Sequence, residues 1–192
     1  VLLLGSGGRE HAMAWSIAKS DKLDELFIAP GNPGTGQVGT NVDLSLSDFD
    51  AILEFIEDNT INLTVVGPEK PLVDGITDFL EEKGHKVFGP SKVAAQLEGS
   101  KEFANQFMKD NRIPTADFQT YSRSEFDNAL KVIKSKDEYP VVLKADGLAG
   151  GKGVFICESA KEVEQRLNEL KEDERFQKAA QKLVVEEFMK GE

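Results

Sequence analysis

The first half of the chain alternates short apolar runs with segments of helical periodicity. Runs of strand length occupy residues 1–4, 26–29, 63–66 and 87–88, and each ends in a turn that contains glycine or proline. Between the runs, apolar residues recur every three or four positions, which predicts helices over residues 9–20, 47–56 and 71–83, the second capped by Ser47. Strands that alternate with helices in this way predict βαβ units and a parallel sheet.

The second half follows a different pattern. Ser91 and Ser100 are each expected to cap a short helix, and the domain changes between Ser100 and Pro114. Two capping boxes, Ser122 with Glu125 and Ser159 with Glu162, then predict helices over residues 123–136 and 160–172. Strands are predicted over residues 141–144, 154–157 and 183–187. This order of strands and helices favours a small α+β module.

Composition narrows the classes of function. A length of 192 residues allows one or two domains, and a net charge of -11 argues against binding to a nucleic-acid backbone. The chain has no apolar run long enough to cross a bilayer. Its one cysteine, Cys157, is expected to be a buried strand thiol, which fits a reducing, cytoplasmic compartment. Because it begins at Val1 without a methionine and stops just after an apolar strand, we expect a piece of a longer protein.

The first glycine-rich loop, residues 5–8, follows a predicted strand and opens a helix. Free N–H groups and the helix dipole favour a phosphate at such a place. A dinucleotide-binding loop would have a third glycine at position 10 and an acidic residue near the end of the second strand, but Glu10 and Ala29 stand there. A tight turn without a ligand is the alternative, and Arg9 beside the loop favours the anion site. His11 is either a proton donor or a surface residue.

The second glycine-rich loop is the most informative stretch. Four glycines lie within residues 147–153, with Lys144 before the loop and Lys152 inside it. A Walker A loop would have glycine at position 146 and Ser or Thr at position 153, but Asp146 and Gly153 stand there. Flexible glycines can fold the backbone over a polyphosphate while lysines supply positive charge. A plain surface hairpin is the alternative, although it would not need four glycines with their ordering entropy.

Residues 184–189 leave a strand with two carboxylates followed by two apolar side chains. The backbone of such a segment can pair with the edge of an adenine, and the Glu side chains can accept hydrogen bonds from its amine or from sugar hydroxyls. A solvated acidic strand end has the same pattern.

Together these motifs resemble the phosphoribosylamine–glycine ligase family, the glycinamide ribonucleotide synthetases of the ATP-grasp superfamily. The resemblance follows the chain in order and rests on residues 5–11, 30–32, 67–72 and 144–154, with further matches at residues 96–101, 107–108 and 113–116. It implies a Rossmann-like, parallel-sheet α/β domain over residues 1–99. The first part of an ATP-grasp domain would follow over residues 100–192, with its small α+β lid subdomain at about residues 114–187.

The resemblance also implies a reaction. Glycine is joined to 5-phosphoribosylamine in purine biosynthesis, and ATP is converted to ADP and phosphate through a glycyl phosphate. The implied cofactors are ATP and Mg²⁺ or Mn²⁺. The implied partners are small molecules, with no nucleic acid and no membrane, and the parent protein would be a cytoplasmic monomer or weak dimer.

Family positions carry over to two sets of residues. The resemblance assigns substrate binding to Gly5, Ser6, Gly7, Gly8, Arg9, Glu10, Pro30, Gly31, Asn32, Gly67, Pro68 and Glu69. It assigns ATP binding to Lys101, Lys144, Gly147, Gly150, Gly151, Lys152, Gly153, Glu186, Glu187, Phe188 and Met189. No catalytic residue is assigned, and the metal ligands are expected beyond residue 192.

Two departures from the family pattern matter. The family's hinge motif continues with Gly-Glu-Glu, whose second Glu contacts the ribose of ATP, whereas this chain ends at Glu192, one residue short. The chain alone is therefore expected to be inactive. Gly150 stands where many relatives have alanine, which loosens the glycine-rich flap slightly.

Three other functions compete with this interpretation. A sister ATP-grasp ligase would act on another phosphorylated amine or carboxylate, and residues 5–11 argue against it. A binding module without catalysis would share the loops. A nicotinamide dehydrogenase is disfavoured by Glu10 and Ala29.

Overall fold

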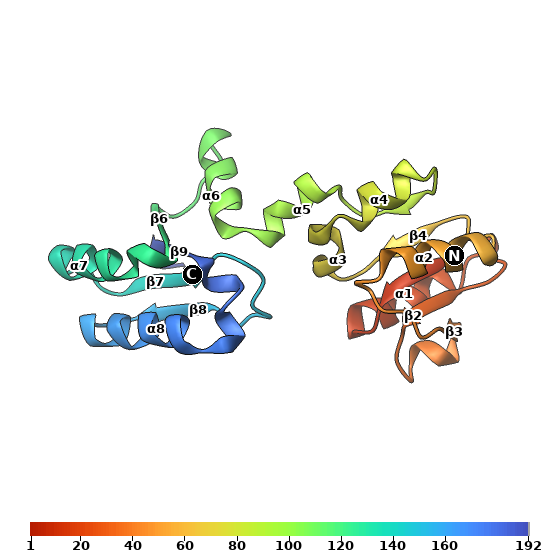
Figure 1. Cartoon of the computed structure of the whole chain (residues 1–192), viewed down its shortest axis with the longest axis horizontal. Helices are drawn as coiled ribbons and strands as arrows, with labels where there is room; N and C mark the ends of the chain where they lie inside the picture. The colour runs from red at the N-terminus through yellow and green to blue at the C-terminus, as the bar shows by residue number, and fades with distance from the viewer. Residues whose placement is uncertain (192) are drawn as a thin grey trace. The chain divides into compact units, whose positions relative to one another are not determined.

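The chain folds into two compact units in a computed structural model that describes residues 1–191. The first unit covers residues 1–95, and the second begins at residue 96. Each unit has its own sheet (Figure 1). Each also has its own hydrophobic core.

The first unit contains a parallel sheet of five strands in the order β3-β2-β1-β4-β5. The strands are β1 (Leu2–Gly5), β2 (Phe27–Pro30), β3 (Thr40–Asn41), β4 (Thr64–Val66) and β5 (Val87–Phe88). Its helical segments are α1 (Gly8–Ile17), η1 (Thr35–Gln37), α2 (Phe49–Asp58), α3 (Glu69–Asp74) and α4 (Ile76–Glu82), and α5 (Lys92–Gly99) begins within it. The predicted parallel sheet is confirmed, whereas β3 was not predicted.

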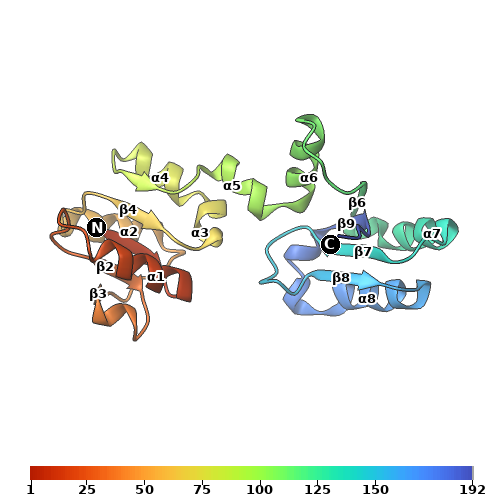
Figure 2. The same ribbon diagram turned by 180° about the vertical axis from the view of Figure 1, so that it is seen from behind.

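Both faces of this sheet are buried, because side chains of β1 alternate between two cores. Leu2 and Leu4 pack against α2, α3 and α4, while Leu3 packs on the opposite face with Ala14 of α1. Figures 1 and 2 show these helices in front and rear views. A strand covered on both faces has to be apolar throughout, which explains the uninterrupted run at the start of the chain.

Two details of the first unit correct the sequence predictions. The single helix expected over residues 71–83 is wrong, since α3 and α4 are separated at Gly75, whose φ of 105° no α-helix accommodates. The cap of α2 is Asp48 rather than Ser47. An Asp48 carboxylate oxygen accepts a hydrogen bond from the Ala51 N–H at 3.0 Å.

The second unit contains an antiparallel sheet in the order β6-β9-β7-β8. Its strands are β6 (Phe118–Ser122), β7 (Val141–Ala145), β8 (Val154–Cys157) and β9 (Lys182–Glu187). Its helical segments are α6 (Lys101–Asp110), η2 (Arg123–Glu125), α7 (Phe126–Lys136), α8 (Ala160–Glu172), η3 (Glu174–Phe176) and η4 (Ala179–Gln181). The predicted α+β module is confirmed.

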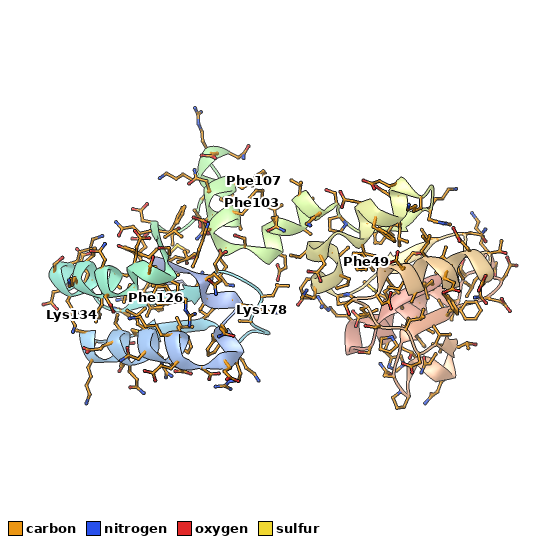
Figure 3. The ribbon with its side chains drawn as sticks, in the orientation of Figure 1. Phe49, Phe103, Phe107, Phe126, Lys134 and Lys178 are labelled. Atoms are coloured by element: carbon orange, nitrogen blue, oxygen red, sulfur yellow. The ribbon has the colours of Figure 1, made fainter. Side chains whose placement is uncertain are left out.

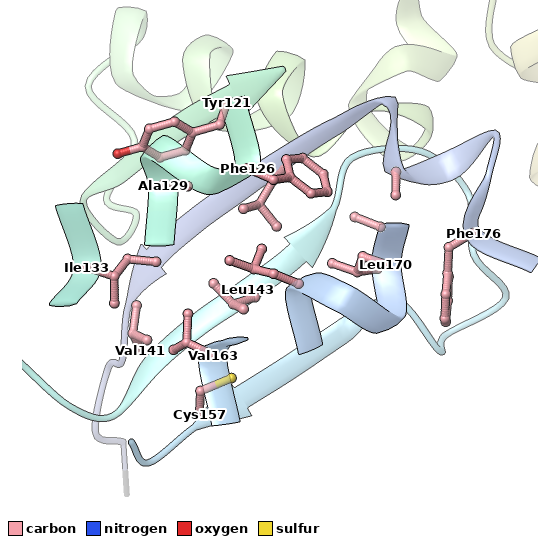
Figure 4. Close-up of a cluster of buried hydrophobic side chains, with 14 of the residues drawn as sticks. Tyr121, Phe126, Ala129, Ile133, Val141, Leu143, Cys157, Val163, Leu170 and Phe176 are labelled. Atoms are coloured by element: carbon pink, nitrogen blue, oxygen red, sulfur yellow. The ribbon is translucent and has the colours of Figure 1, made fainter. Parts of the chain in front are cut away.

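One face of this sheet is covered by α7 and α8. Phe126 and Leu170 from the helices meet Leu143 from β7 in a common core (Figure 4). Cys157 lies in the same core as expected, and its burial raises the pKa of the thiol to about 11. None of the helices formed by residues 1–191 has both the length and the apolar content needed to span a membrane.

Helix caps in the second unit follow the sequence closely. Ser100 accepts a hydrogen bond from the Phe103 N–H at 3.1 Å, and Ser122 and Glu125 form the expected reciprocal box. Only one of the two hydrogen bonds expected for the second box is present: the Ser159 hydroxyl accepts from the Glu162 N–H. The Glu162 carboxylate accepts from the Glu158 N–H instead of the Ser159 N–H.

Candidate functional site

In the first unit, three loops meet at the carboxyl edge of the sheet. The strands β2 and β3 lie on one side of β1, whereas β4 and β5 lie on its other side. The order therefore reverses between β1 and β4, the place where open α/β sheets bind ligands. Gly5 ends β1 and Gly67 follows β4, so both glycines border this position.

Hydrogen bonds join the loops after β1 and β2. The Gly31 N–H donates to the Gly5 carbonyl at 3.1 Å, and the Asn32 side-chain amide donates to the Ser6 carbonyl at 2.9 Å. The Asn32 side-chain oxygen accepts from the N–H groups of Gly34 and Thr35. Asn32 thus holds the two loops in place, and the structure brings together the predicted substrate residues of both.

Glu10 lies beneath the first loop rather than on its surface. It is 3% exposed, and its Oε2 accepts a hydrogen bond from the Gly7 N–H at 2.7 Å. A Cβ atom at Gly5 would lie 2.3 Å from Glu10 Cγ, and one at Gly67 would lie 2.4 Å from Glu10 Oε1. The two glycines therefore make room for this carboxylate. Its Oε1 has no hydrogen-bond partner among the described residues, and a contact of Glu10 with substrate stays a prediction.

Charged side chains also connect the loops after β1 and β4. The Arg9 guanidinium donates to Glu69 Oε2 at 3.1 Å. A backbone N–H and this guanidinium hold the pKa of the Glu69 carboxyl below its usual range. Arg9 remains largely exposed, so its charge is available at the edge of the sheet. His11 packs against Gly34, where an added Cβ would lie 2.3 Å from the ring.

In the second unit, two side chains that are predicted to bind ATP lie on the sheet face opposite α7 and α8. Lys144 of β7 and Glu186 of β9 are paired at 2.5 Å between Nζ and Oε2. The Asn105 side-chain amide of α6 donates to Glu186 Oε1 at 2.8 Å. Glu186 is 7% exposed, and both of its oxygens have a partner. This buried carboxylate is thus held by one cation and one neutral donor.

Lys101 lies at the start of α6, beside the base of the glycine-rich loop. Its ammonium donates to the carbonyls of Asp146 and Gly147, each at 3.3 Å. Burial lowers the pKa of Lys101. The Asp146 carboxylate opposes this shift, and the positive charge of Lys144 adds to it. The structure therefore brings both predicted phosphate-binding lysines into one electrostatic environment.

The glycine-rich loop has fixed ends and an open middle. At its ends, the Gly147 N–H donates to the Ala179 carbonyl at 3.0 Å, and the Ala145 N–H donates to the Gly153 carbonyl at 2.8 Å. Gly150 and Gly151 have φ angles of 56° and 78°, and a Cβ at either would meet no atom within 4 Å. Such a loop can fold over a ligand while its two ends stay attached to the unit.

The expected adenine hinge divides between the two faces of the sheet. Side chains alternate along a strand, so Glu187 points away from the face that carries Glu186. Glu187 Oε1 accepts from the Asp117 N–H at 3.2 Å. Phe188 and Met189 follow with exposures of 37% and 62%. The structure thus places Glu186, but not the Glu187 side chain, beside Lys144.

Sequence reasoning missed Asn105 and the exposed apolar side chains of β8. Val154 lies opposite Lys144 and Ile156 opposite Val142, so their side chains share the face of Lys144 and Glu186. They are 46% and 54% exposed. A sequence signal existed for Asn105, because it follows Lys101 by four positions and shares its helix face.

The opposite side of α6 carries two exposed aromatic side chains. Phe103 and Phe107 project from this side, with ring centroids 6.5 Å apart and exposures of 38% and 41% (Figure 3). The helix therefore separates an ionic face, which contacts the sheet, from an exposed aromatic face.

Within residues 1–191, no group of three or more His, Cys, Asp or Glu side chains has the arrangement to hold a metal ion. The carboxylates of Asp146 and Glu186, which lie beside the two lysines, already have protein partners.

The second unit also contains a cavity of about 350 Å³. It borders β6, the end of α7 and the end of β9, and its lining includes Glu186 but neither Lys101 nor Lys144.

Both units match models of the same protein family. The family model described as the N domain of phosphoribosylglycinamide synthetase matches residues 1–98, and that of its ATP-grasp (A) domain matches residues 99–192. A curated relative, the phosphoribosylamine–glycine ligase of Clostridium acetobutylicum, is 47% identical over 191 residues. The match covers all of this chain and 45% of the relative. The chain thus spans about half the length of the curated relatives it matches.

Solved structures agree with these matches. A phosphoribosylamine–glycine ligase from Thermotoga maritima superposes with a TM-score of 0.76 at 35% identity, over the whole of this chain and 44% of that one. An N5-carboxyaminoimidazole ribonucleotide synthetase from the same organism, at 22% identity and a TM-score of 0.70, shares the fold. By the family models that match both of its units, the chain belongs to the phosphoribosylglycinamide synthetase family and has an ATP-grasp fold in its second unit.

Proposed function

We propose that this chain is the N-terminal portion of a cytoplasmic ligase of purine biosynthesis. The full-length protein joins glycine to 5-phosphoribosylamine and converts ATP to ADP and phosphate. The observation that carries this proposal is the cluster formed by Lys101, Lys144 and Glu186 beside a glycine-rich loop with an open middle. Residues 100–192 would begin the ATP-grasp domain, with a lid at about residues 114–187, and residues 1–99 would bind the phosphorylated amine.

The sheet face of the second unit suits a nucleotide triphosphate. Val154 and Ile156 offer an exposed apolar surface for a purine ring. They lie on the same sheet face as Glu186, with β7 between, and the Glu186 carboxylate can accept from an exocyclic amine. Lys101 and Lys144 supply two positive charges for the phosphates. Gly150 and Gly151 give the loop the freedom to cover them. These features support an assignment of ATP binding to the second unit.

The carboxyl edge of the first unit suits a phosphorylated sugar. The loop at Gly5–Gly8 precedes the N-terminus of α1, and Arg9 adds a positive charge beside it. Glu69 and Asn32 place polar side chains at the same edge. The Glu10 carboxylate already occupies the Gly7 N–H, so the phosphate would use the remaining N–H groups and Arg9.

The chemistry explains why these groups are needed. A carboxylate such as that of glycine is a poor electrophile, and phosphorylation gives it a leaving group that an amine can displace. Lysines offset the charge of the transferred phosphoryl group, and a closed flap excludes the water that would hydrolyse an acyl phosphate. The metal that accompanies ATP would be Mg²⁺ or Mn²⁺. Among residues 1–191, no cluster of three or more His, Cys, Asp or Glu side chains is arranged to hold it.

Omission of one substrate at a time tests this proposal. Phosphate release from MgATP is measured with the full-length protein, in the presence of glycine and freshly prepared 5-phosphoribosylamine. Release that requires both co-substrates supports the ligase. Release that continues without glycine points to a sister ligase with another carboxylate, and a folded protein that binds ATP without releasing phosphate points to a binding module.

A further inference from the structure

Asp146 is the residue between the end of β7 and the glycine-rich loop, and its contacts reach the N-terminus of α6. One carboxylate oxygen accepts from the Glu102 N–H at 2.8 Å, and both oxygens lie within 3.1 Å of the Ser100 hydroxyl. Ser100 is itself the N-cap of α6. A single carboxylate therefore joins the start of this helix to the base of the loop, which are more than forty positions apart in sequence.

The backbone of Asp146 completes the connection. The Lys101 N–H donates to the Asp146 carbonyl at 3.2 Å, and the Asp146 N–H donates to the Lys182 carbonyl at 3.1 Å. The Lys101 ammonium contacts the same Asp146 carbonyl and that of Gly147. The backbone N–H and the side-chain ammonium of Lys101 are thus both held by carbonyls of Asp146 and its neighbour Gly147. An ion pair of Lys182 with Glu102 strengthens the junction.

We infer that Asp146 is a positioning residue for Lys101. Its carboxylate holds the first turn of α6 against the base of the loop, and this contact sets the place of the Lys101 ammonium at the mouth of the flap. The inference rests on the proposed function, because Lys101 is there assigned to the phosphates of ATP. A ligand contact of Asp146 itself is not required, since its oxygens are engaged by Ser100 and Glu102.

Two variants separate the shape of Asp146 from its charge. Asp146→Asn keeps the volume and an oxygen that can accept from Glu102, but it removes the negative charge beside Lys101. Asp146→Ala removes both contacts. Asp110→Asn is the matched control, because Asp110 is exposed at the other end of α6. Its carboxylate accepts a hydrogen bond from the Gln106 side-chain amide, within the same helix.

The test measures KM for MgATP and kcat in the full-length protein. A displaced Lys101 loses a charge-assisted contact with bound ATP, so we expect KM to rise about fivefold in Asp146→Asn and about tenfold in Asp146→Ala, with kcat nearly unchanged. A purely structural role would lower kcat through loss of folded protein and would leave KM unchanged. We expect Asp110→Asn to match the wild type.

A pH profile supplies a second readout. The charged groups around the Lys101 ammonium are Asp146, Lys144 of β7, Glu98 of α5 and Glu186 of β9. Removal of the negative charge of Asp146 favours deprotonation of Lys101, so the loss of MgATP affinity at alkaline pH should begin at a lower pH in Asp146→Asn. This readout decides the matter if Asp146→Ala does not fold.

The outcomes distinguish the inference from the proposed function. A wild-type protein that does not use MgATP overturns the proposed function and the inference with it. A wild-type protein that uses MgATP, together with an Asp146→Asn variant of unchanged KM and unchanged pH profile, overturns the inference alone. A raised KM with a shifted profile supports it.

Discussion

Lys144 is the residue that tests the proposed nucleotide site most directly. Its ammonium pairs with the buried Glu186, which also accepts from Asn105. Replacement by alanine therefore removes a cation from the site but leaves Glu186 with one hydrogen-bond partner. This contrast allows the role of Lys144 in binding to be separated from its role in folding.

We expect Lys144→Ala to weaken MgATP binding about tenfold or more and to leave the far-ultraviolet circular dichroism spectrum unchanged. Isothermal titration calorimetry of the full-length protein measures the affinity. Lys134→Ala is the control, because Lys134 lies on α7 in an exposed pair with Glu164. If Lys144→Ala bound MgATP as tightly as the wild type, the assignment of Lys144 to the phosphates would be wrong.

We expect Lys101 to make MgATP binding at the proposed site depend on pH. Its pKa is lowered chiefly by burial, so the ammonium loses its proton at a lower pH than an exposed lysine would. Affinity for MgATP should be full below this lowered pKa and should fall as the pH rises through it. Arginine stays protonated over the same pH range, so the affinity of Lys101→Arg for MgATP should not decrease as the pH rises. Identical titration curves for the two proteins would show that another group is responsible.

At the scale of secondary structure, the junction of α3 and α4 tests how strictly backbone geometry limits the sequence. Gly75 has a φ of 105°, and a Cβ there would lie 3.1 Å from Lys92 Cδ. We expect Gly75→Ala to lower the free energy of unfolding by about 1–2 kcal/mol, as measured by urea denaturation. Gly8→Ala is the control, because Gly8 lies in α1 with no atom within 4 Å of an added Cβ. Equal stability of both variants would contradict the strain argument.

The elements that the sequence predicted well are those with a local cause. The strands β1 and β4 lie in apolar runs, and Ser100 and Ser122 cap helices through contacts within a few residues. The break at Gly75 was missed because an apolar helical period continues on both sides of it. The strand β3 was missed because its residues, Thr40 and Asn41, are polar and exposed, so that their pairing with β2 leaves no apolar pattern.

The same reasoning explains what was missed in the site. Motifs identified the two lysines and both loops, because glycine and lysine spacing is visible in the sequence. The roles of Asn105 and Asp146 depend on contacts between α6, β7 and β9, whose residues lie far apart in the chain. The buried position of Glu10 likewise depends on Gly5, which ends β1, and on Gly67, which follows β4.

At the scale of the molecule, the two units have separate cores that share no residue. Phe126 is fully buried in the core of the second unit. Phe126→Ala should lower the stability of that unit by about 3–5 kcal/mol. Hydrogen exchange should accelerate in β7 and β9 and remain slow in β1 and β4. Phe88→Ala, at a side chain that is 67% exposed, is the control. Equal acceleration in β1 would contradict independent cores.

The central claim is that the protein activates the carboxylate of glycine by phosphorylation. The most direct test follows ¹⁸O from carboxylate-labelled glycine during a reaction of the full-length protein with MgATP and 5-phosphoribosylamine. Attack of the amine on a glycyl phosphate leaves one carboxylate oxygen on the departing phosphate. The proposal therefore predicts inorganic phosphate that carries one ¹⁸O atom, detected by mass spectrometry. Unlabelled phosphate formed together with the ligated product would contradict it.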